Sequence, residues 1–380
     1  METLIITICG LVTLFGLAIT VRCVLAQKRI QWLMPSPASV PFNAKVSVII
    51  PARNEEYDIA PALRSILNQE GVDLEVIVVN DHSTDRTAEI IEHIARTDRR
   101  VTALHDPPLL NGWLGKCNAM QHGAQRAGSE FLLFTDADIV HAPNCFATVL
   151  NEMQQNAYDF LSLFPRCINR CLWENINIPI YFFGVAKLLA TPGLEDPDSP
   201  DAVASGALML IKARVFQEID GFREVKGEMF DDVGLARLLK ARRYRVGYRL
   251  APECVQVQLF KNNRDAFWGN TKNILTAVED RVWLAVPLML LAFLQYWTPV
   301  LAMVLAVLNP SPLLLIVGFC TYGIQYMGFF TVRRILRFDP LKLLFFPLVA
   351  IVGACCISRA LYYRARAEIT WRGRTIRVHE

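Results

Sequence analysis

The sequence predicts an α/β fold in which a mostly parallel, doubly wound sheet is flanked by apolar helices near both ends of the chain. From Lys45 onward, short apolar segments alternate with segments of helical periodicity, which is typical of a parallel sheet. Hydrophobic residues make up 53% of the 380 residues, and they are concentrated toward the two ends. The net charge of only +3 gives no indication of a nucleic-acid partner.

The first apolar segment is long enough to cross a membrane. Leu4–Val21 carries no charge, and Arg22 can extend the span by snorkelling. A cleaved signal peptide is the alternative, but its positive charges would precede the apolar segment, whereas Arg22 and Arg29 follow it. The same charges favour a cytoplasmic position for the residues that come next. We therefore expect a transmembrane helix within residues 1–30 and a proline-containing linker at 31–44.

Strands and helices then alternate through the central part of the chain. Runs of apolar, often β-branched residues predict strands, and apolar residues on one helical face predict helices. The predicted strands are Val46–Ile50, Leu74–Val79, Val101–Leu104, Phe131–Phe134, Phe160–Phe164 and Ala207–Ile211, and the predicted helices lie at Leu63–Leu67, Ala88–Ala95, Lys116–Ala127 and Phe230–Lys240. This order predicts one doubly wound sheet.

Three polar clusters follow predicted strands, at Pro51–Glu56, Asn80–Asp85 and Thr135–Asp138. Because such sheets bind ligands outside the carboxyl ends of their strands, we expect the clusters to meet at one crevice. Asp136 and Asp138 lie one residue apart on a turn, so both carboxylates can face this crevice, where oxygen ligands suit Mg²⁺ or Mn²⁺ and the cation can neutralise a diphosphate. The alternative is that both aspartates cap the helix that follows.

The last part of the chain is predicted to meet the membrane. Residues 172–189 and 262–281 are rich in aromatic side chains, which is typical of segments that lie against lipid. Residues 282–308 and 312–332 are uncharged, and each is long enough to span. Residues 343–358 are uncharged but short, and a full third crossing would place a basic tail outside, so we expect this segment to be re-entrant.

The ten cysteines are scattered, and several lie in hydrophobic segments. This distribution argues against a disulfide framework and favours reduced thiols in a protein that faces the cytosol. The spacing of Cys167 and Cys171 suggests zinc as an alternative, but no second Cys or His pair follows at a finger-like distance.

Eight short motifs follow one another along the chain. They lie at residues 51–55 (Pro-Ala-Arg-Asn-Glu), 78–85 (Val-Val-Asn-Asp-His-Ser-Thr-Asp), 112–119 (Gly-Trp-Leu-Gly-Lys-Cys-Asn-Ala), 135–138 (Thr-Asp-Ala-Asp), 204–207 (Ala-Ser-Gly-Ala), 231–236 (Asp-Asp-Val-Gly-Leu-Ala), 268–273 (Trp-Gly-Asn-Thr-Lys-Asn) and 371–374 (Trp-Arg-Gly-Arg). In this order and spacing they resemble the membrane-bound family 2 glycosyltransferases, which have the nucleotide-diphospho-sugar transferase fold. The chain is similar to the members that glycosylate lipids, namely the hopene-associated, carotenoid and ceramide glycosyltransferases.

The resemblance implies roles for the residues in these motifs. Asp136 and Asp138 would hold the divalent cation, and Asp232, with Asp231 beside it, would be the base for the acceptor hydroxyl; both of the latter also suit the start of a helix. Glu55 and Asp81 would hold the nucleoside, and Lys116 would meet the diphosphate, unless it is merely an exposed lysine at a helix start. The implied nucleotide-sugar residues are Pro51, Arg53, Glu55, Asp81, Lys116, Asp136, Ser205 and Gly206, and those implied on the acceptor and membrane side are Trp173, Trp268 and Lys272.

The resemblance further implies transfer of one sugar from a nucleotide sugar, such as a UDP-hexose, to a membrane lipid of the hopanoid, carotenoid or ceramide type. A single base opposite the leaving group would invert the anomeric centre. The stretch that carries an Arg-Trp pair in processive synthases and ceramide glucosyltransferase has Gln256, Gln258, Arg264 and Trp268 instead, which argues against a polymerising enzyme. A polyprenyl-phosphate sugar synthase and a silent nucleotide-binding membrane protein remain as alternatives.

We therefore expect an integral protein of the bacterial inner membrane with its catalytic domain in the cytoplasm. The expected parts are a transmembrane helix at 1–30, a linker at 31–44, a glycosyltransferase domain at 45–260, an amphipathic interfacial helix at 261–281, membrane segments at 282–363 and a basic cytoplasmic tail at 364–380.

Overall fold

The chain forms two compact units in the computed structural model, which describes residues 2–28, 31–36, 45–190, 193–196, 198–277, 282–365, 368–371 and 374–377. The sheet unit consists of Ile30–Cys167 and Thr191–Val257, and the helical unit consists of Met1–Arg29, Ile168–Ala190 and Gln258–Glu380. Residues 168–190 therefore group with the helices, although they lie within the stretch 45–260 predicted as one domain. Most of the predicted linker, at 37–44, lies outside the described residues.

A seven-stranded sheet forms the centre of the sheet unit, with strand order β3-β2-β1-β4-β8-β6-β9. The strands are β1 (Lys45–Ala52), β2 (Asp73–Asn80), β3 (Val101–His105), β4 (Phe131–Phe134), β6 (Phe160–Phe164), β8 (Met209–Lys212) and β9 (Val246–Leu250). β1 is parallel to β2 and β4, and β2 is parallel to β3, whereas β8 runs antiparallel to β4 and β6. The mostly parallel α/β sheet predicted from the sequence is thereby confirmed.

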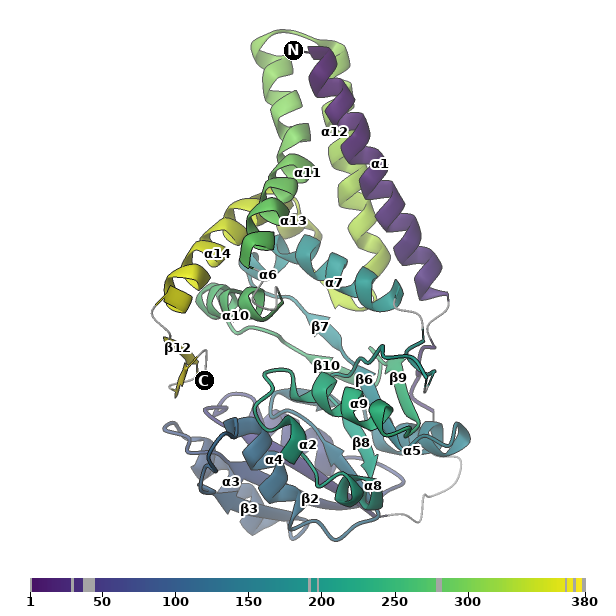
Figure 1. Ribbon diagram of the computed structural model, residues 1–380, viewed down its shortest axis with the longest axis vertical. Helices are drawn as coiled ribbons and strands as arrows, with labels where there is room; N and C mark the ends of the chain where they lie inside the picture. The colour runs from purple at the N-terminus through teal and green to yellow at the C-terminus, as the bar shows by residue number, and fades with distance from the viewer. Residues whose placement is uncertain are drawn as a thin grey trace. The chain divides into compact units, whose positions relative to one another are not determined.

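Helices and a second, smaller group of strands complete the sheet unit (Figure 1). The helices are α2 (Ile59–Leu67), α3 (Thr87–Thr97), α4 (Gly115–Ala124), α5 (Cys145–Gln155), α8 (Ala213–Glu218), η1 (Arg223–Val225) and α9 (Asp231–Ala241). The small strands are β5 (Ile139–His141), β7 (Arg166–Ile168) and β10 (Val255–Val257), and β10 pairs with both of the others.

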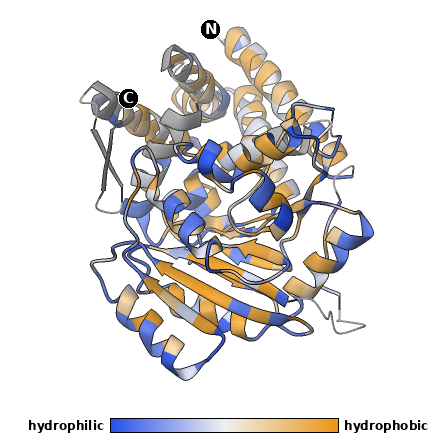
Figure 2. Cartoon of the chain, turned by 60° about the horizontal axis from the view of Figure 1, so that its bottom comes forward, coloured by the Kyte–Doolittle hydropathy of each residue, from blue (hydrophilic) through white to orange (hydrophobic). Residues whose placement is uncertain are grey.

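The central strands consist mainly of apolar residues, which Figure 2 shows in the hydrophobic colour. Consecutive residues of β1, β2 and β4 are buried, so both faces of these strands are covered. All four residues of β4 are buried, and the Phe134 ring meets the Phe222 ring edge-on at 5.1 Å. α4 packs so closely on the sheet that a Cβ on Gly123 would lie 2.5 Å from Cγ2 of Ile49. This close contact fixes the position of α4 on the sheet, and with it the position of the start of the helix relative to the strand ends.

The predicted strand at Ala207–Ile211 begins two residues later in the structure, at Met209. Residues 205–208 instead form a turn, in which Leu208 N donates to Ser205 O at 3.3 Å. The reason is that Ser205 is tied to β6 by hydrogen bonds, so that the chain turns before it can join the sheet.

The helical unit is built from long apolar helices and several short elements. Its elements are α1 (Glu2–Gln27), α6 (Leu172–Ile176), α7 (Ile178–Ala190), α10 (Asn263–Ala277), α11 (Val282–Leu308), α12 (Pro312–Phe329), η2 (Phe330–Val332), β11 (Leu336–Arg337), α13 (Pro340–Leu343), η3 (Phe346–Leu348), α14 (Val349–Ala365), β12 (Glu368–Trp371) and β13 (Arg374–Arg377). Within the described residues, three helical spans are long and apolar enough to cross a membrane: Glu2–Gln27, Val286–Leu308 and Pro312–Val332.

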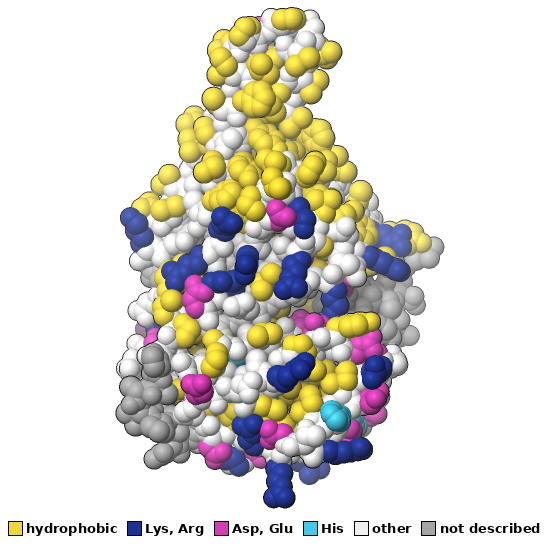
Figure 3. All heavy atoms as spheres, turned by 180° about the vertical axis from the view of Figure 1, so that it is seen from behind, with side chains coloured by type: hydrophobic (Ala, Val, Ile, Leu, Met, Phe, Trp, Pro, Cys, Tyr) yellow, Lys and Arg dark blue, Asp and Glu magenta, His cyan; other side chains and the backbone are white. Residues whose placement is uncertain are grey.

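These three helices turn apolar side chains outward and polar ones inward. Gln325 Nε2 donates to Gln295 O at 2.9 Å, and Thr13 Oγ1 lies 3.0 Å from Thr321 Oγ1. Large apolar residues such as Leu301 are exposed, and Figure 3 shows hydrophobic side chains over this part of the surface. This arrangement is the one expected of helices surrounded by lipid, because polar groups must find partners inside the bundle.

Pro179 lies inside the apolar segment 172–189, where a proline would be expected to interrupt a helix. The structure places the break earlier, between α6 and α7, at Asn177. Pro179 is the second residue of α7, a position where a helix does not need the missing N–H. The predicted re-entrant segment 343–358 falls on η3 and α14, whose apolar stretch Phe346–Tyr362 is shorter than the three spans, and re-entrance stays a prediction.

Candidate functional site

Lys116 lies at the centre of a charged cluster beside the carboxyl end of β4. It is the second residue of α4, so its side chain extends from the start of that helix. Its Nζ lies 2.9 Å from Oδ1 of Asp136 and 3.5 Å from Oδ2 of Asp231. Asp136 follows β4, and Asp231 opens α9. The fold thus brings carboxylates from two distant segments to one ammonium group.

The backbone of Gly206 packs directly against this cluster. Gly206 N donates to Oδ2 of Asp232 at 2.8 Å, while Oδ1 of Asp232 accepts from Val233 N at 2.8 Å. A Cβ at position 206 would lie 2.9 Å from Lys116 Nζ and 3.1 Å from Oδ2 of Asp136. A residue with a side chain would therefore force Lys116 and Asp136 to shift, whereas glycine lets the backbone approach the cluster.

Burial and repulsion shift the titration of these groups. Burial, and then the neighbouring Asp231, raises the pKa of Asp232 to about 6. Burial also raises the pKa of Asp231, although Lys116 opposes this effect. Burial disfavours the charge on Lys116, but Asp136, Asp231 and Asp232 outweigh it and hold its pKa well above the usual range. Lys116 therefore stays positively charged, while the same surroundings favour protonation of Asp231 and Asp232.

Asp138 is the second carboxylate of the turn that follows β4. Burial, and then the carboxylates of Asp136 and Asp58, raises its pKa to about 7. Carboxylates that repel one another in this way, with only oxygen donors, fit a hard divalent cation such as Mg²⁺ or Mn²⁺. Among the described residues no three His, Cys, Asp or Glu side chains gather as a ligand set, so phosphate or water oxygens would have to complete the coordination.

A second group of predicted residues lies at the ends of β1 and β2. Arg53 Nη1 donates to the carbonyl oxygen of Asp81 at 2.7 Å. Glu55 is almost fully buried, and its N–H donates to Thr87 Oγ1 at 2.7 Å. Pro51 lies in β1 itself, opposite a residue of β2. Because β1, β2 and β4 are parallel, these residues lie at the same end of the sheet as Asp136, where the strands have their carboxyl ends.

One residue that shapes the site, Ser162, belongs to none of the eight motifs, and Thr135 makes a contact that its motif did not predict. Ser162 Oγ in β6 accepts from Ser205 N at 2.8 Å and donates to Ser205 O at 3.1 Å, which fixes the backbone before Gly206. Thr135 Oγ1 donates to Ala207 O at 2.7 Å. The one signal in the sequence is that Ser162 is a lone polar residue within an apolar strand.

The residues predicted on the acceptor side lie in the helical unit. The Trp173 ring meets the Phe267 ring edge-on at 5.6 Å, and the Arg359 guanidinium lies 5.3 Å from the centre of the Trp268 ring. The side chain of Lys272 lies outside the described residues. The structure thus places the two tryptophans in a different unit from Lys116.

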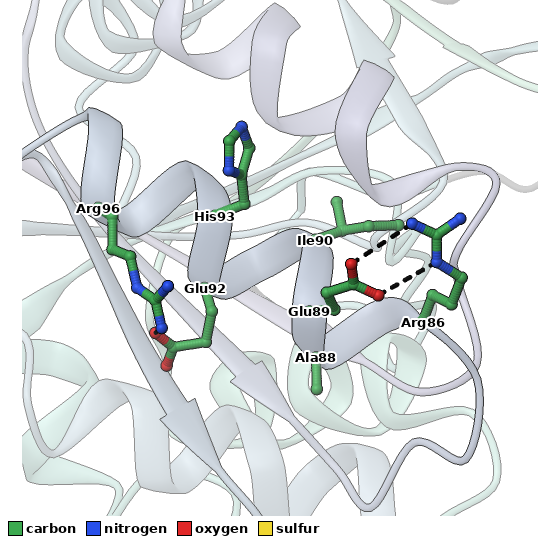
Figure 4. A pocket seen from close by; sticks show the side chains of 7 residues that line it. All are labelled: Arg86, Ala88, Glu89, Ile90, Glu92, His93 and Arg96. Atoms are coloured by element: carbon green, nitrogen blue, oxygen red, sulfur yellow. Dashed lines mark hydrogen bonds and ion pairs between the residues drawn. The ribbon is translucent and has the colours of Figure 1, made fainter.

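A surface pocket on α3 contains none of the candidate site residues. Figure 4 shows its lining, in which Arg86 and Glu89 form an exposed ion pair at 3.1 Å. Such exposed pairs contribute little to stability. Because the pocket contains none of the motif residues proposed for the site, the carboxyl end of the sheet is the candidate site.

Three comparisons with known proteins bear on this geometry. Residues 47–219 match the family model described as glycosyl transferase family 2. A 4,4'-diaponeurosporenoate glycosyltransferase of Staphylococcus aureus is 33% identical over 158 residues, which is 41% of this chain and 41% of the relative. The chain thus matches about two fifths of the length of these curated relatives. A mannosyltransferase from Pyrobaculum calidifontis, solved with GDP-Man and Mn²⁺, has a TM-score of 0.50 and 18% identity and covers 92% of this chain and 98% of its own, which shows a shared fold.

Proposed function

We propose that this chain, whose residues 47–219 are a glycosyl transferase family 2 domain, moves one sugar from a nucleotide sugar to a membrane lipid. The observation that carries the proposal is the cluster of Lys116, Asp136, Asp231 and Asp232 around Gly206 at the carboxyl edge of the sheet. It supplies a fixed positive charge and several carboxylates at the place where such sheets bind ligands.

Lys116 stabilises the departing diphosphate in this proposal. Its ammonium stays charged, and α4 presents backbone N–H groups beside it at the helix start. Asp136 and Asp138 hold a divalent cation, Mg²⁺ or Mn²⁺, which when bound neutralises charge on the diphosphate. Lys116 Nζ lies 2.9 Å from Oδ1 of Asp136, so the ammonium group that would meet the phosphates lies beside a carboxylate that would hold the cation.

Asp232 takes the proton from the acceptor hydroxyl. Its pKa of about 6 suits a base that works near neutral pH, and the N–H groups of Gly206 and Val233 fix the orientation of its carboxylate. With this one base opposite the leaving group, a single displacement inverts the anomeric carbon. Asp231 is the neighbouring carboxylate, and its contact with Lys116 supports a role in charge balance instead.

The donor in this proposal is a UDP sugar. Its nucleoside is held at the ends of β1 and β2 by Arg53, Glu55 and Asp81. Carboxylates accept hydrogen bonds from ribose hydroxyls and from the uracil N–H. The acceptor is a lipid of the hopanoid, carotenoid or ceramide type. Two observations support a lipid: the Staphylococcus aureus relative is named for a carotenoid acid, and three helices here are apolar enough to span a bilayer.

The test is to incubate membranes from expressing cells with labelled UDP-hexoses and with GDP-mannose, which occurs in the solved neighbour, and to identify labelled lipids by mass spectrometry. We expect one nucleotide sugar to label one lipid class in a manner that depends on a divalent cation. Membranes that carry the Lys116→Ala variant are the control. Repeated absence of any labelled lipid across these donors would favour the alternative of a silent nucleotide-binding membrane protein.

A further inference from the structure

His141 lies at the end of the turn that carries the two proposed cation ligands. The turn leaves β4 at Thr135, passes through Asp136 and Asp138, and enters β5, whose last residue is His141. The His141 ring returns to the start of the turn, where its Nε2 lies 3.2 Å from Thr135 Oγ1. Both side chains are almost fully buried. The contact between Thr135 and His141 therefore joins the two ends of the turn that contains Asp136 and Asp138.

The same hydroxyl connects this loop to the glycine segment. Thr135 Oγ1 lies 2.7 Å from the carbonyl oxygen of Ala207, the residue after Gly206. On its other side, His141 packs edge-on against the Phe146 ring at 5.1 Å, and its backbone N donates to Ser65 Oγ at 3.1 Å. The histidine thus links the turn to α2 and α5, which are rigid elements of the fold.

The hydrogen bonds also assign the position of the ring proton. The Thr135 hydroxyl has one hydrogen, and it goes to Ala207 O, so Thr135 Oγ1 must accept from His141 Nε2–H. Burial lowers the pKa of His141 to about 3, so the ring is neutral and carries a single hydrogen. His141 Nδ1 is then without a hydrogen, and it lies 3.5 Å from Ser65 Oγ.

We propose that His141 is a positioning residue for the divalent cation: by donating Nε2–H to Thr135, it holds the turn so that Asp136 and Asp138 face the diphosphate. The inference rests on the proposed function for the identity of the cation site, but it concerns binding of the cation itself. Removing a partner that hydrogen-bonds a metal ligand directly changes metal affinity by about 10- to 100-fold, and His141, which acts through Thr135, is expected at the lower end of this range.

Three substitutions at His141 distinguish the effect of its hydrogen-bond donor, Nε2–H, from the effect of the shape of its ring. His141→Gln places an amide N–H near the position of Nε2, His141→Asn places one near Nδ1, and His141→Phe keeps a ring against Phe146 without any donor. We measure Mn²⁺ binding to the purified full-length protein from the electron paramagnetic resonance signal of free Mn²⁺. Thermal unfolding of each variant shows whether it is folded.

The expected dissociation constant for Mn²⁺ rises by about 10-fold or more in His141→Asn and His141→Phe, and stays within about 3-fold of the parent in His141→Gln. Equal affinity in the folded His141→Phe protein, or equal loss in His141→Gln and His141→Asn, would overturn the proposal. If the His141 variants do not fold, Thr135→Val decides, because it removes the hydroxyl and keeps the histidine. An unchanged constant there also overturns it.

This readout is separate from sugar transfer. A parent protein that binds Mn²⁺ with the expected pattern but labels no lipid would contradict the proposed function and keep the role of His141. A parent protein that transfers sugar without binding Mn²⁺ would contradict the role of His141 and keep the transfer.

Discussion

Asp232 differs from its neighbour Asp231 in what holds its carboxylate. Two backbone N–H groups, from Gly206 and Val233, fix both oxygens of Asp232, whereas Asp231 is buried against Lys116. A base has to keep one orientation while it accepts a proton, and backbone donors provide this without adding a competing cation. At the residue scale, the sequence offers two adjacent carboxylates and the contacts distinguish them.

Replacing Asp232 with Asn should lower kcat by about 100- to 10,000-fold, because the amide cannot accept the proton from the acceptor. KM for the nucleotide sugar should change little, since Lys116 keeps its contact with Asp136. Steady-state kinetics with labelled donor measure both. The control is Glu89→Gln on exposed α3. Undiminished turnover would favour an acceptor that is already ionised, such as a polyprenyl phosphate.

The pH dependence of kcat should report the ionisation of Asp232. The pKa of Asp232 is raised to about 6, so the carboxylate is protonated, and inactive as a base, below that pH. We expect kcat to rise with pH through about 6 and then to level off. The small residual rate of the Asp232→Asn protein should lack this step. A step near pH 4, the ordinary range of aspartate, would show that the site does not shift this pKa.

α4 positions Lys116 through its close packing on the sheet. The helix approaches β1 and β2 at Gly123, where a Cβ would lie 2.5 Å from Ile49 Cγ2 and 3.1 Å from Val79 Cγ2. Lys116 lies two turns earlier on the same helix. At the scale of the element, the distance between helix and sheet therefore decides where the ammonium meets Asp136.

Gly123→Ala should push α4 away from the sheet and lower the melting temperature, with a loss of about 1–3 kcal/mol in the free energy of unfolding. The displacement of Lys116 should also raise KM for the nucleotide sugar. Gly128→Ala is the matched control, because no heavy atom lies within 4 Å of a Cβ there. Thermal unfolding followed by tryptophan fluorescence compares the two, and an equal melting temperature would contradict the close packing.

The helical unit has the character of a membrane bundle. Polar groups such as those of Gln295 and Gln325 pair inside it, while large apolar side chains are exposed. Ser311, at the turn between α11 and α12, hydrogen-bonds Glu2 at the start of α1. At the scale of the whole molecule, the N-terminus and this turn therefore lie on the same side of any bilayer that the helices cross.

If the sheet unit is cytoplasmic, that side is the outer one. In a background without native cysteines, Ser311→Cys should react with a membrane-impermeant maleimide in intact cells, whereas Glu70→Cys, on the surface of the sheet unit, should react only after lysis. Labelling of Glu70→Cys alone would reverse the proposed orientation, and labelling of both positions would contradict a membrane crossing between them.

The sequence by itself determined the α/β sheet, the apolar spans and the positions of Asp136, Asp138 and Lys116 at element ends. Each depends on periodicity or spacing over a few residues, and the strands Phe131–Phe134 and Phe160–Phe164 agree with the structure to the residue. The tertiary structure alone decided that residues 168–190 group with the helices, that Gly206 orients Asp232, and that His141 closes the turn through Thr135. These features depend on contacts between segments distant in sequence, or on the direction of a buried side chain, which local patterns do not encode.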